Sequence, residues 1–156
     1  MTFLLGSDHA GFALRRILAN WLVDHGYAVS EFGATDESAF DYPDAAVEMS
    51  GRFAKGDGTF GVLVCGTGIG MAMAVNKFKG IRAAVCWNED SARLSRQHTH
   101  ANVLCLGGRL IPPEEAVKIL EVFLSAEASR ESRHVRRVGK IDKLGECKEP
   151  TIAYSE

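Results

Sequence analysis

The chain has 156 residues, of which 46% are hydrophobic and 24% are charged, and its formal net charge at pH 7 is −2. This length fits one globular domain, and the charge provides no basic field that would attract nucleic acid. No apolar run approaches the ~20 residues that span a bilayer, and residues 1–6 are typical of a first strand rather than a signal peptide. We therefore expect a cytoplasmic protein whose partners include neither nucleic acid nor membrane.

Short apolar runs alternate with helical patterns along the chain. In order, they predict a strand at 3–5, a helix at 12–22, a strand at 27–29, a helix at 42–55, a strand at 61–65 and a helix at 71–77. A strand at 82–86, a helix at 90–97, a strand at 102–106, a helix at 112–123 and a basic helix at 131–144 follow. Residues 145–156 are expected to form a loose tail.

This alternation predicts a parallel sheet with helices on both faces. We expect an α/β fold, a three-layer αβα Rossmann-like sandwich with a five-stranded parallel sheet and an extra C-terminal helix, built as one domain over residues 1–144. Ligands of such folds bind at the carboxyl ends of the strands. Three polar segments follow predicted strands, and they should share this edge of the sheet: Ser7–His9, Cys65–Thr67 and Gly107–Arg109.

A glycine-rich turn, Gly66–Gly70, joins the strand at 61–65 to the next helix. Such a turn directs several backbone N–H groups toward one point, where they can bind a phosphate or a developing oxyanion. Its Gly-x-Gly-x-Gly spacing differs from the dinucleotide fingerprint, and the Gly-Lys-Ser/Thr of a Walker loop is missing. A tight turn without any ligand remains the alternative.

Cys65 directly precedes this turn. A thiol beside backbone donors at the start of a helix ionises more readily than a free cysteine, so Cys65 is a candidate base or nucleophile. The alternatives are a buried cysteine at a strand end and a redox thiol, although no resolving partner is near in sequence. Cys86 and Cys105 lie inside apolar runs, which indicates small buried hydrophobic residues of a protein in a reducing compartment.

Other polar residues give weaker signals. Asp8 and His9 end the first strand and could hold a sugar hydroxyl and an anion, or could simply be a cap and a surface histidine. His98 and His100 flank Thr99 between a predicted helix and strand, where either could be an acid-base group or an ordinary loop residue.

Arginines supply candidate phosphate ligands. Arg109 follows a Gly-Gly pair, and Arg133 and Arg137 are four residues apart on the basic helix, so they share a face. Such a pair suits a phosphate, although a solvated basic helix is the alternative. The terminal position suggests that this helix reaches a neighbouring subunit. No cluster with metal-ligand spacing emerges, and we expect no metal and no cofactor.

Seven short motifs occur in an order that resembles the type B ribose-5-phosphate isomerase family, which includes the galactose-6-phosphate isomerase subunits. The resemblance covers about residues 1–143. The motifs are Gly6–Gly11, Asp41–Asp44, Cys65–Gly70, Ala74–Lys77, Gly80–Ala83, Ala101–Leu104 and Gly107–Arg109.

The resemblance implies a metal-free enzyme, an intramolecular oxidoreductase that interconverts aldose and ketose phosphates, most directly ribose 5-phosphate and ribulose 5-phosphate. It implies that Cys65 moves the proton through an enediolate, that Thr67 stabilises the oxyanion and that His98 helps to open the sugar ring. The backbone of Gly66, Gly68, Ile69 and Gly70 would join Thr67 at the oxyanion. By the same resemblance, Asp8 and Tyr42 contact the sugar and the phosphate ligands are His9, Arg109, Arg133 and Arg137.

The resemblance also implies homodimers or homotetramers with sites shared between subunits. One departure concerns the sugar: family members usually have His-Asn-Asp or His-Asn-Asn where this chain has His98-Thr99-His100. The Asn contacts the reacting part of the sugar, and Thr99 lacks its amide. Another sugar phosphate therefore stays open, such as a hexose 6-phosphate (allose or galactose) or a tetrose phosphate, as does a non-catalytic sugar-phosphate-binding subunit.

Overall fold

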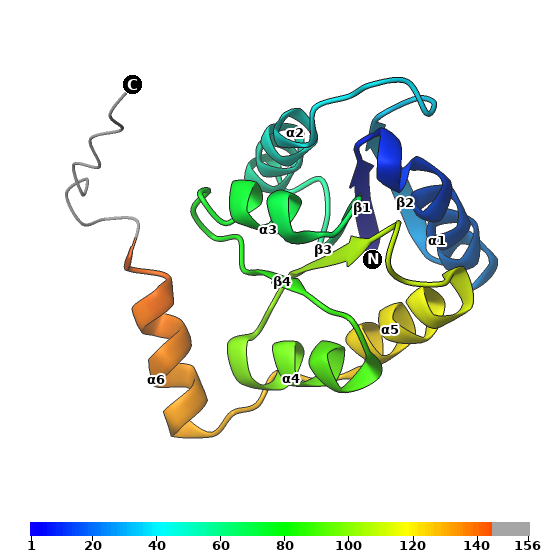
Figure 1. Cartoon of the computed structure of the whole chain (residues 1–156). Helices are drawn as coiled ribbons and strands as arrows, with labels where there is room; N and C mark the ends of the chain where they lie inside the picture. Colours follow the sequence, from blue (N-terminus) through cyan, green and yellow to red (C-terminus); the bar gives the residue numbers. More distant parts are fainter. Residues whose placement is uncertain (145–156) are drawn as a thin grey trace.

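The structure, a computed structural model, describes residues 1–144 and contains a five-stranded parallel sheet between two layers of helices (Figure 1). The sheet has the strand order β2-β1-β3-β5-β4. Its strands are β1 (Thr2–Ser7), β2 (Ala28–Gly33), β3 (Phe60–Cys65), β4 (Ala83–Val85) and β5 (Val103–Gly107). The helices are a short 3-10 turn at His9–Gly11, α1 (Phe12–Asp24), α2 (Tyr42–Lys55), α3 (Ile69–Val75), α4 (Glu89–Thr99), α5 (Pro113–Ser125) and α6 (Ser132–Ile141). The predicted αβα sandwich with an extra C-terminal helix is confirmed.

Two hydrophobic layers follow from the alternation of side chains along the strands. Phe3 and Leu5 of β1 face the layer that contains α1 and α5, whereas Leu4 between them faces α2 and α3. Both faces of the central strands are buried, which is why these strands are almost continuously apolar in sequence. The sheet is therefore a rigid support for whatever lies at its two edges.

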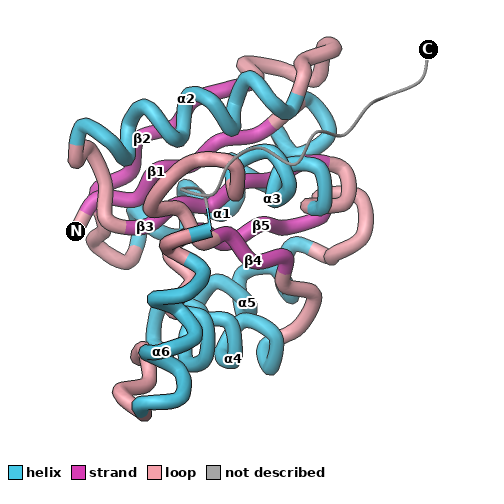
Figure 2. The backbone as a smooth tube through the Cα atoms, turned by 90° about the vertical axis from the view of Figure 1, so that its left-hand side faces the viewer, coloured by secondary structure: helices cyan, strands magenta, loops and turns pink. Residues whose placement is uncertain are grey.

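Helix α6 stands apart from this sandwich and packs beside α4 (Figures 1 and 2). Its two buried residues, His134 and Val138, are four apart and so share one face, while its arginines point to solvent. Within residues 1–144, no helix is both long and apolar enough to cross a membrane.

Several element boundaries differ from the predicted ones. Helix α4 runs to Thr99 rather than to 97, because a capping box between Asn88 and Ser91 starts it and His100, with φ 51°, ends it. His98 and Thr99 are therefore helical residues and not loop residues. Helix α3 starts at Ile69, inside the predicted turn, and α6 covers Ser132–Ile141 of the predicted 131–144. The predicted tail, 145–156, lies outside the described residues.

Candidate active site

Cys65 is the last residue of β3, and its side chain is 4% exposed. The backbone N–H of Gly68 donates a hydrogen bond to its Sγ over 3.1 Å. The chain after β3 therefore folds back over the sulfur, which is held against the glycine-rich turn. A backbone donor at this distance stabilises negative charge on the acceptor.

The turn needs glycine at particular places. Gly68 has φ +79°, which favours glycine, and a Cβ there would lie 3.0 Å from the backbone carbon of Leu106. A Cβ on Gly70 would lie 2.8 Å from the ring of Tyr42, the first residue of α2. Close packing of backbone and ring thus fixes the turn and brings Tyr42 against it.

The other carboxyl-edge candidates lie beside this turn. The backbone N–H of Asp8 donates to Val64 O over 3.2 Å, and its carboxylate accepts from Gly11 N–H over 2.9 Å. The Nδ1 of His9 lies 3.2 Å from Phe40 O. Arg109 N–H donates to Gly66 O over 3.1 Å. The structure thus brings Asp8, His9, Tyr42, Arg109 and residues 65–70 together at one edge, as the strand-end rule predicts.

Thr67 and Ile69 are exposed on the open side of this edge. Thr67 Oγ1 accepts a hydrogen bond from Ile69 N–H over 3.3 Å. Ile69 and Gly70 begin α3, where backbone N–H groups have no acceptor within the helix. The hydroxyl and these N–H groups form a polar surface next to Cys65.

The remaining candidates lie at the opposite edge, where the strands begin. Arg82 precedes β4 and its Nε donates to His100 O over 3.1 Å, while Asn102 precedes β5 and its carbonyl accepts from Gly61 N–H over 3.0 Å. The six residues of β3 separate this edge from Cys65 by roughly 17 Å at ~3.3 Å per residue. His98, Thr99, Arg133 and Arg137 are thus not brought to the Cys65 of their own chain.

These amino-edge residues form a second group around α4 and α6. The ring of His98 stacks on the ring of His134, with centroids 4.3 Å apart and an angle of 6° between the planes. Arg133 Nε forms an ion pair with Glu131 over 2.8 Å, and Arg137 is exposed one turn further along α6. Thr99 Oγ1 donates to Ser95 O over 2.6 Å and so bonds within its own helix.

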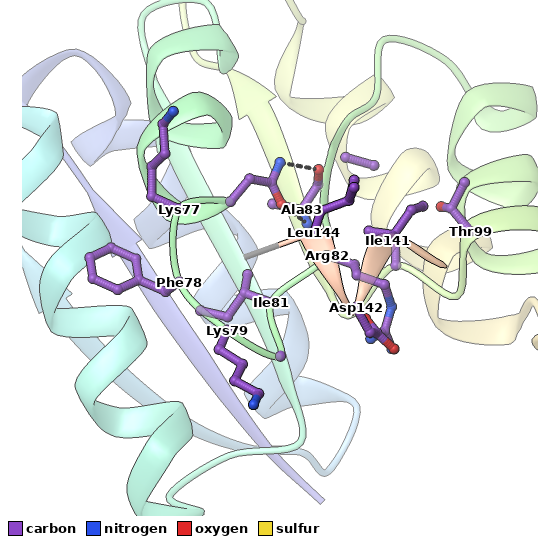
Figure 3. A pocket seen from close by; sticks show the side chains of 14 residues that line it. Lys77, Phe78, Lys79, Ile81, Arg82, Ala83, Thr99, Ile141, Asp142 and Leu144 are labelled. Atoms are coloured by element: carbon purple, nitrogen blue, oxygen red, sulfur yellow. Dashed lines mark hydrogen bonds and ion pairs between the residues drawn. The ribbon is translucent and has the colours of Figure 1, made fainter. Parts of the chain in front are cut away.

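Two cavities adjoin this second group and not Cys65. One, of about 410 Å³, is lined by His98, His134 and the connection before α6. The other, of about 490 Å³, lies between the α3–β4 connection and the end of α6, and Figure 3 shows Thr99 and Ile141 on its α4–α6 side. An ion pair between Arg82 and Asp142, 2.9 Å long, connects the two sides of this larger cavity.

The other described cysteines have the inert character predicted for them. Burial raises the pKa of the Cys86 thiol, and it raises that of the fully buried Cys105 well above the usual range. A neutral, enclosed thiol is neither a base nor a nucleophile. Among the described cysteines, Cys65 alone has its sulfur hydrogen-bonded to the glycine turn.

Sequence reasoning gave His134 no role beyond a place on a basic helix. The structure buries it against His98, and burial is the main cause that lowers its pKa, followed by the charges of His98 and Arg133. Glu131 acts in the opposite direction, and Arg137 lowers the pKa further. In the sequence, the four-residue spacing of His134 and Val138 could have indicated which face of α6 is buried.

The chain is similar to known proteins over most of its length. A family profile described as Ribose/Galactose Isomerase matches residues 3–141. The chain is 41% identical to ribose-5-phosphate isomerase B of Escherichia coli over 139 residues, covering 89% of this chain and 93% of that protein. It is similar to a solved structure of Clostridium thermocellum ribose-5-phosphate isomerase B, with a TM-score of 0.90, 41% identity and coverage of 94% and 98% of the two chains.

A second solved structure, a ribose 5-phosphate isomerase from Thermotoga maritima, gives a TM-score of 0.88 at 43% identity and covers 92% of this chain and 98% of that one. The probable ribose-5-phosphate isomerase B of Mycoplasma pneumoniae is 41% identical over 138 residues, which are 88% of this chain and 90% of that protein. The likeness therefore extends over nearly the whole described chain and includes both edges of the sheet.

Proposed function

Because the chain belongs to the ribose/galactose isomerase family, we propose that it isomerises sugar phosphates, converting ribose 5-phosphate into ribulose 5-phosphate and back. Relatives with this activity in their names match at about two-fifths identity over nearly their full length. The observation that carries the proposal is the position of Cys65, whose sulfur is bonded to the glycine turn beside an open polar surface.

Aldose–ketose isomerisation moves a proton between adjacent carbons. In the proposed reaction, the Cys65 thiolate removes the proton from C2 of the open-chain aldose, and the C1 carbonyl becomes an enediolate oxygen. The same thiol returns the proton to C1, while a proton passes from O2 to O1 and leaves the ketose. A base of suitable proton affinity and a preformed oxyanion site are what such a weakly acidic C–H requires.

The glycine turn supplies the oxyanion site in this proposal. Thr67 and the backbone N–H groups of residues 66–70 are assigned to the enediolate oxygen, and each such donor stabilises the transition state by about 3 kcal/mol. Because Cys65 and these donors carry out the chemistry, we assign neither a metal nor a cofactor to the reaction. Residues 1–144 contain no group of three potential ligands that could hold a metal ion.

The carboxyl edge also offers groups for the rest of the substrate. We assign Asp8 to sugar hydroxyls, Tyr42 to the face of the sugar, and His9 and Arg109 to the phosphate. Arg109 is supported by its position over Gly66, where its Nη1 lies 3.5 Å from the place a Cβ would occupy. A phosphate bound far from C1 and C2 provides binding energy that orients the reacting atoms.

A second copy of the chain completes the site in this proposal. His98, Thr99, Arg133 and Arg137 would come from the neighbouring copy, since roughly 17 Å of strand separates the two edges within one chain. Exposed apolar side chains at both regions support self-association, among them Ile69 and Leu110 near Cys65 and Val135 on α6. We therefore propose a homodimer, or a tetramer built from it, in which His98 opens the sugar ring. The unpaired cysteines of residues 1–144 support a cytoplasmic location.

One observation keeps a second substrate in consideration. The hydroxyl of Thr99 already donates to Ser95 O, so this side chain offers its methyl group where family members usually carry an amide. The second candidate is therefore a sugar phosphate of different length, such as a hexose 6-phosphate or a tetrose phosphate.

A substrate panel tests the proposal. Purified protein would be assayed with four-, five- and six-carbon aldose phosphates in the presence of a chelator. We expect turnover, with ribose 5-phosphate as the best substrate, and Thr99→Asn should leave that order unchanged. A better hexose or tetrose substrate whose advantage disappears in Thr99→Asn would transfer the assignment to that sugar. No turnover of any sugar would contradict the isomerase assignment.

A further inference from the structure

The stacked histidine pair joins the two elements of the amino-edge group. His98 is in the last turn of α4 and exposed, whereas His134 is in the first turn of α6 and 4% exposed. Their rings are nearly parallel, with centroids 4.3 Å apart. An exposed histidine can ordinarily adopt several rotamers, and a buried ring against one of its faces removes most of that freedom.

The second ring is an unusual choice for packing alone. Nδ1 of His134 is buried and has no hydrogen-bond partner among the described residues, and its Nε2 is 4.0 Å from Glu131 Oε2. A buried, unpaired ring nitrogen destabilises the folded state, and a leucine would fill the space without that cost. What a leucine cannot provide is a flat face for His98.

Charged groups lie near the pair on two consecutive segments of the chain. The connection before α6 contributes Glu127, Arg130 and Glu131, which line the same cavity as the two rings, and α6 contributes Arg133 and Arg137. Burial and the neighbouring positive charges lower the pKa of His134. The shift favours the neutral form of His134, and His98 is the exposed ring of the pair, the one that a substrate can reach.

We propose that His134 is a positioning residue for the isomerisation, whose buried ring fixes the orientation of the His98 imidazole by stacking. This inference rests on the proposed function, in which His98 opens the sugar ring. His134 itself touches no substrate; it fixes the plane in which the His98 ring meets the sugar. General acid-base groups lose rate when they are misplaced by even about 1 Å.

Two substitutions of similar bulk separate stacking from simple space filling. His134→Phe retains a flat ring beneath His98, and His134→Leu fills the cavity without one. We expect kcat for ribose 5-phosphate to stay within about threefold of wild type in His134→Phe and to fall at least about tenfold in His134→Leu, with little change in KM. His25→Ala is the matched control, because His25 also stacks, on Trp21 at 3.9 Å, but lies at the end of α1.

NMR spectroscopy can report the position of the His98 ring without a measurement of turnover. In NMR spectra, the ring protons of His98 should show a ring-current shift in wild type and His134→Phe that is absent from His134→Leu. If His134→Phe and His134→Leu are both active with equal kcat values, the positioning role is overturned. Equal His98 chemical shifts in wild type and in both variants would also overturn it. An inactive wild-type protein would instead contradict the proposed function, and the two failures are thereby distinguished.

Discussion

The two edges of the sheet carry two halves of the proposed site, and the halves are built differently. At the carboxyl edge, Cys65 is nearly buried and is bonded to a backbone N–H, and Gly68 and Gly70 permit close packing around it. At the amino edge, the arginines of α6 are long and exposed, on a helix that projects from the sandwich (Figure 1).

The difference teaches that the backbone donors of the first half are preorganised within one chain, whereas the arginines of the second half are not. Backbone donors fixed by a turn lose little entropy when they meet an oxyanion. Exposed arginine side chains must be ordered by something else, such as a bound phosphate or a neighbouring chain. We therefore expect changes at Cys65 and its glycine turn to affect chemistry, and changes of the exposed arginines of α6 to affect binding.

The largest expected effect comes from the thiol. Cys65→Ala and Cys65→Ser should each reduce kcat for ribose 5-phosphate by at least about 10²-fold, because a positioned base contributes ~10²–10⁴. The sheet around position 65 should stay folded, which circular dichroism and the thermal midpoint will check. Turnover near the wild-type rate in Cys65→Ala would exclude this residue as the base.

A smaller effect, on binding, is expected from α6. Arg137→Ala should raise KM for ribose 5-phosphate by about tenfold or more, since charge-assisted hydrogen bonds contribute about 1.5–3 kcal/mol. The value of kcat should change much less. Arg136→Ala is the matched control, because Arg136 is also exposed but lies on another face of α6. Equal KM values in the two variants would remove Arg137 from the phosphate site.

The smallest effect concerns stability at the amino edge. The pKa of His134 is lowered in the folded chain, so between that pKa and about 6.5 the unfolded chain binds a proton that the folded chain does not. Stability should therefore fall as the pH drops below about 6.5, until the folded-state pKa is passed. His134→Leu should make this dependence flatter in urea unfolding at about pH 7.5 and about pH 5.5. If the loss of stability between these two pH values were the same in wild type and in His134→Leu, this prediction would be contradicted.

The carboxyl edge was predictable from sequence, because parallel strands all end on the same side and polar residues follow three of them. The location of His98 and Thr99 follows from the same rule in reverse: a helix that follows a strand returns to the edge where the next strand begins. The predicted helix at 90–97 ends two residues early and leaves both residues in a loop, but a loop at this same edge.

The stack of His98 on His134 was not predictable in this way. The two residues are 36 positions apart, and their contact depends on how the segment between α5 and α6 directs the last helix. No local pattern encodes that direction. The inward face of α6 could have been inferred from His134 and Val138, but not the side chain that it would meet.

Mixing two inactive variants tests most directly whether one site uses both edges from two chains. Cys65→Ala removes the carboxyl-edge base, and His98→Asn removes the amino-edge histidine. Coexpressed in equal amounts, they should recover about a quarter of wild-type turnover, because half of the dimers are mixed and each mixed dimer has one intact site of two. Mixed dimers that native mass spectrometry detects but that remain as inactive as the two parents would contradict the shared site.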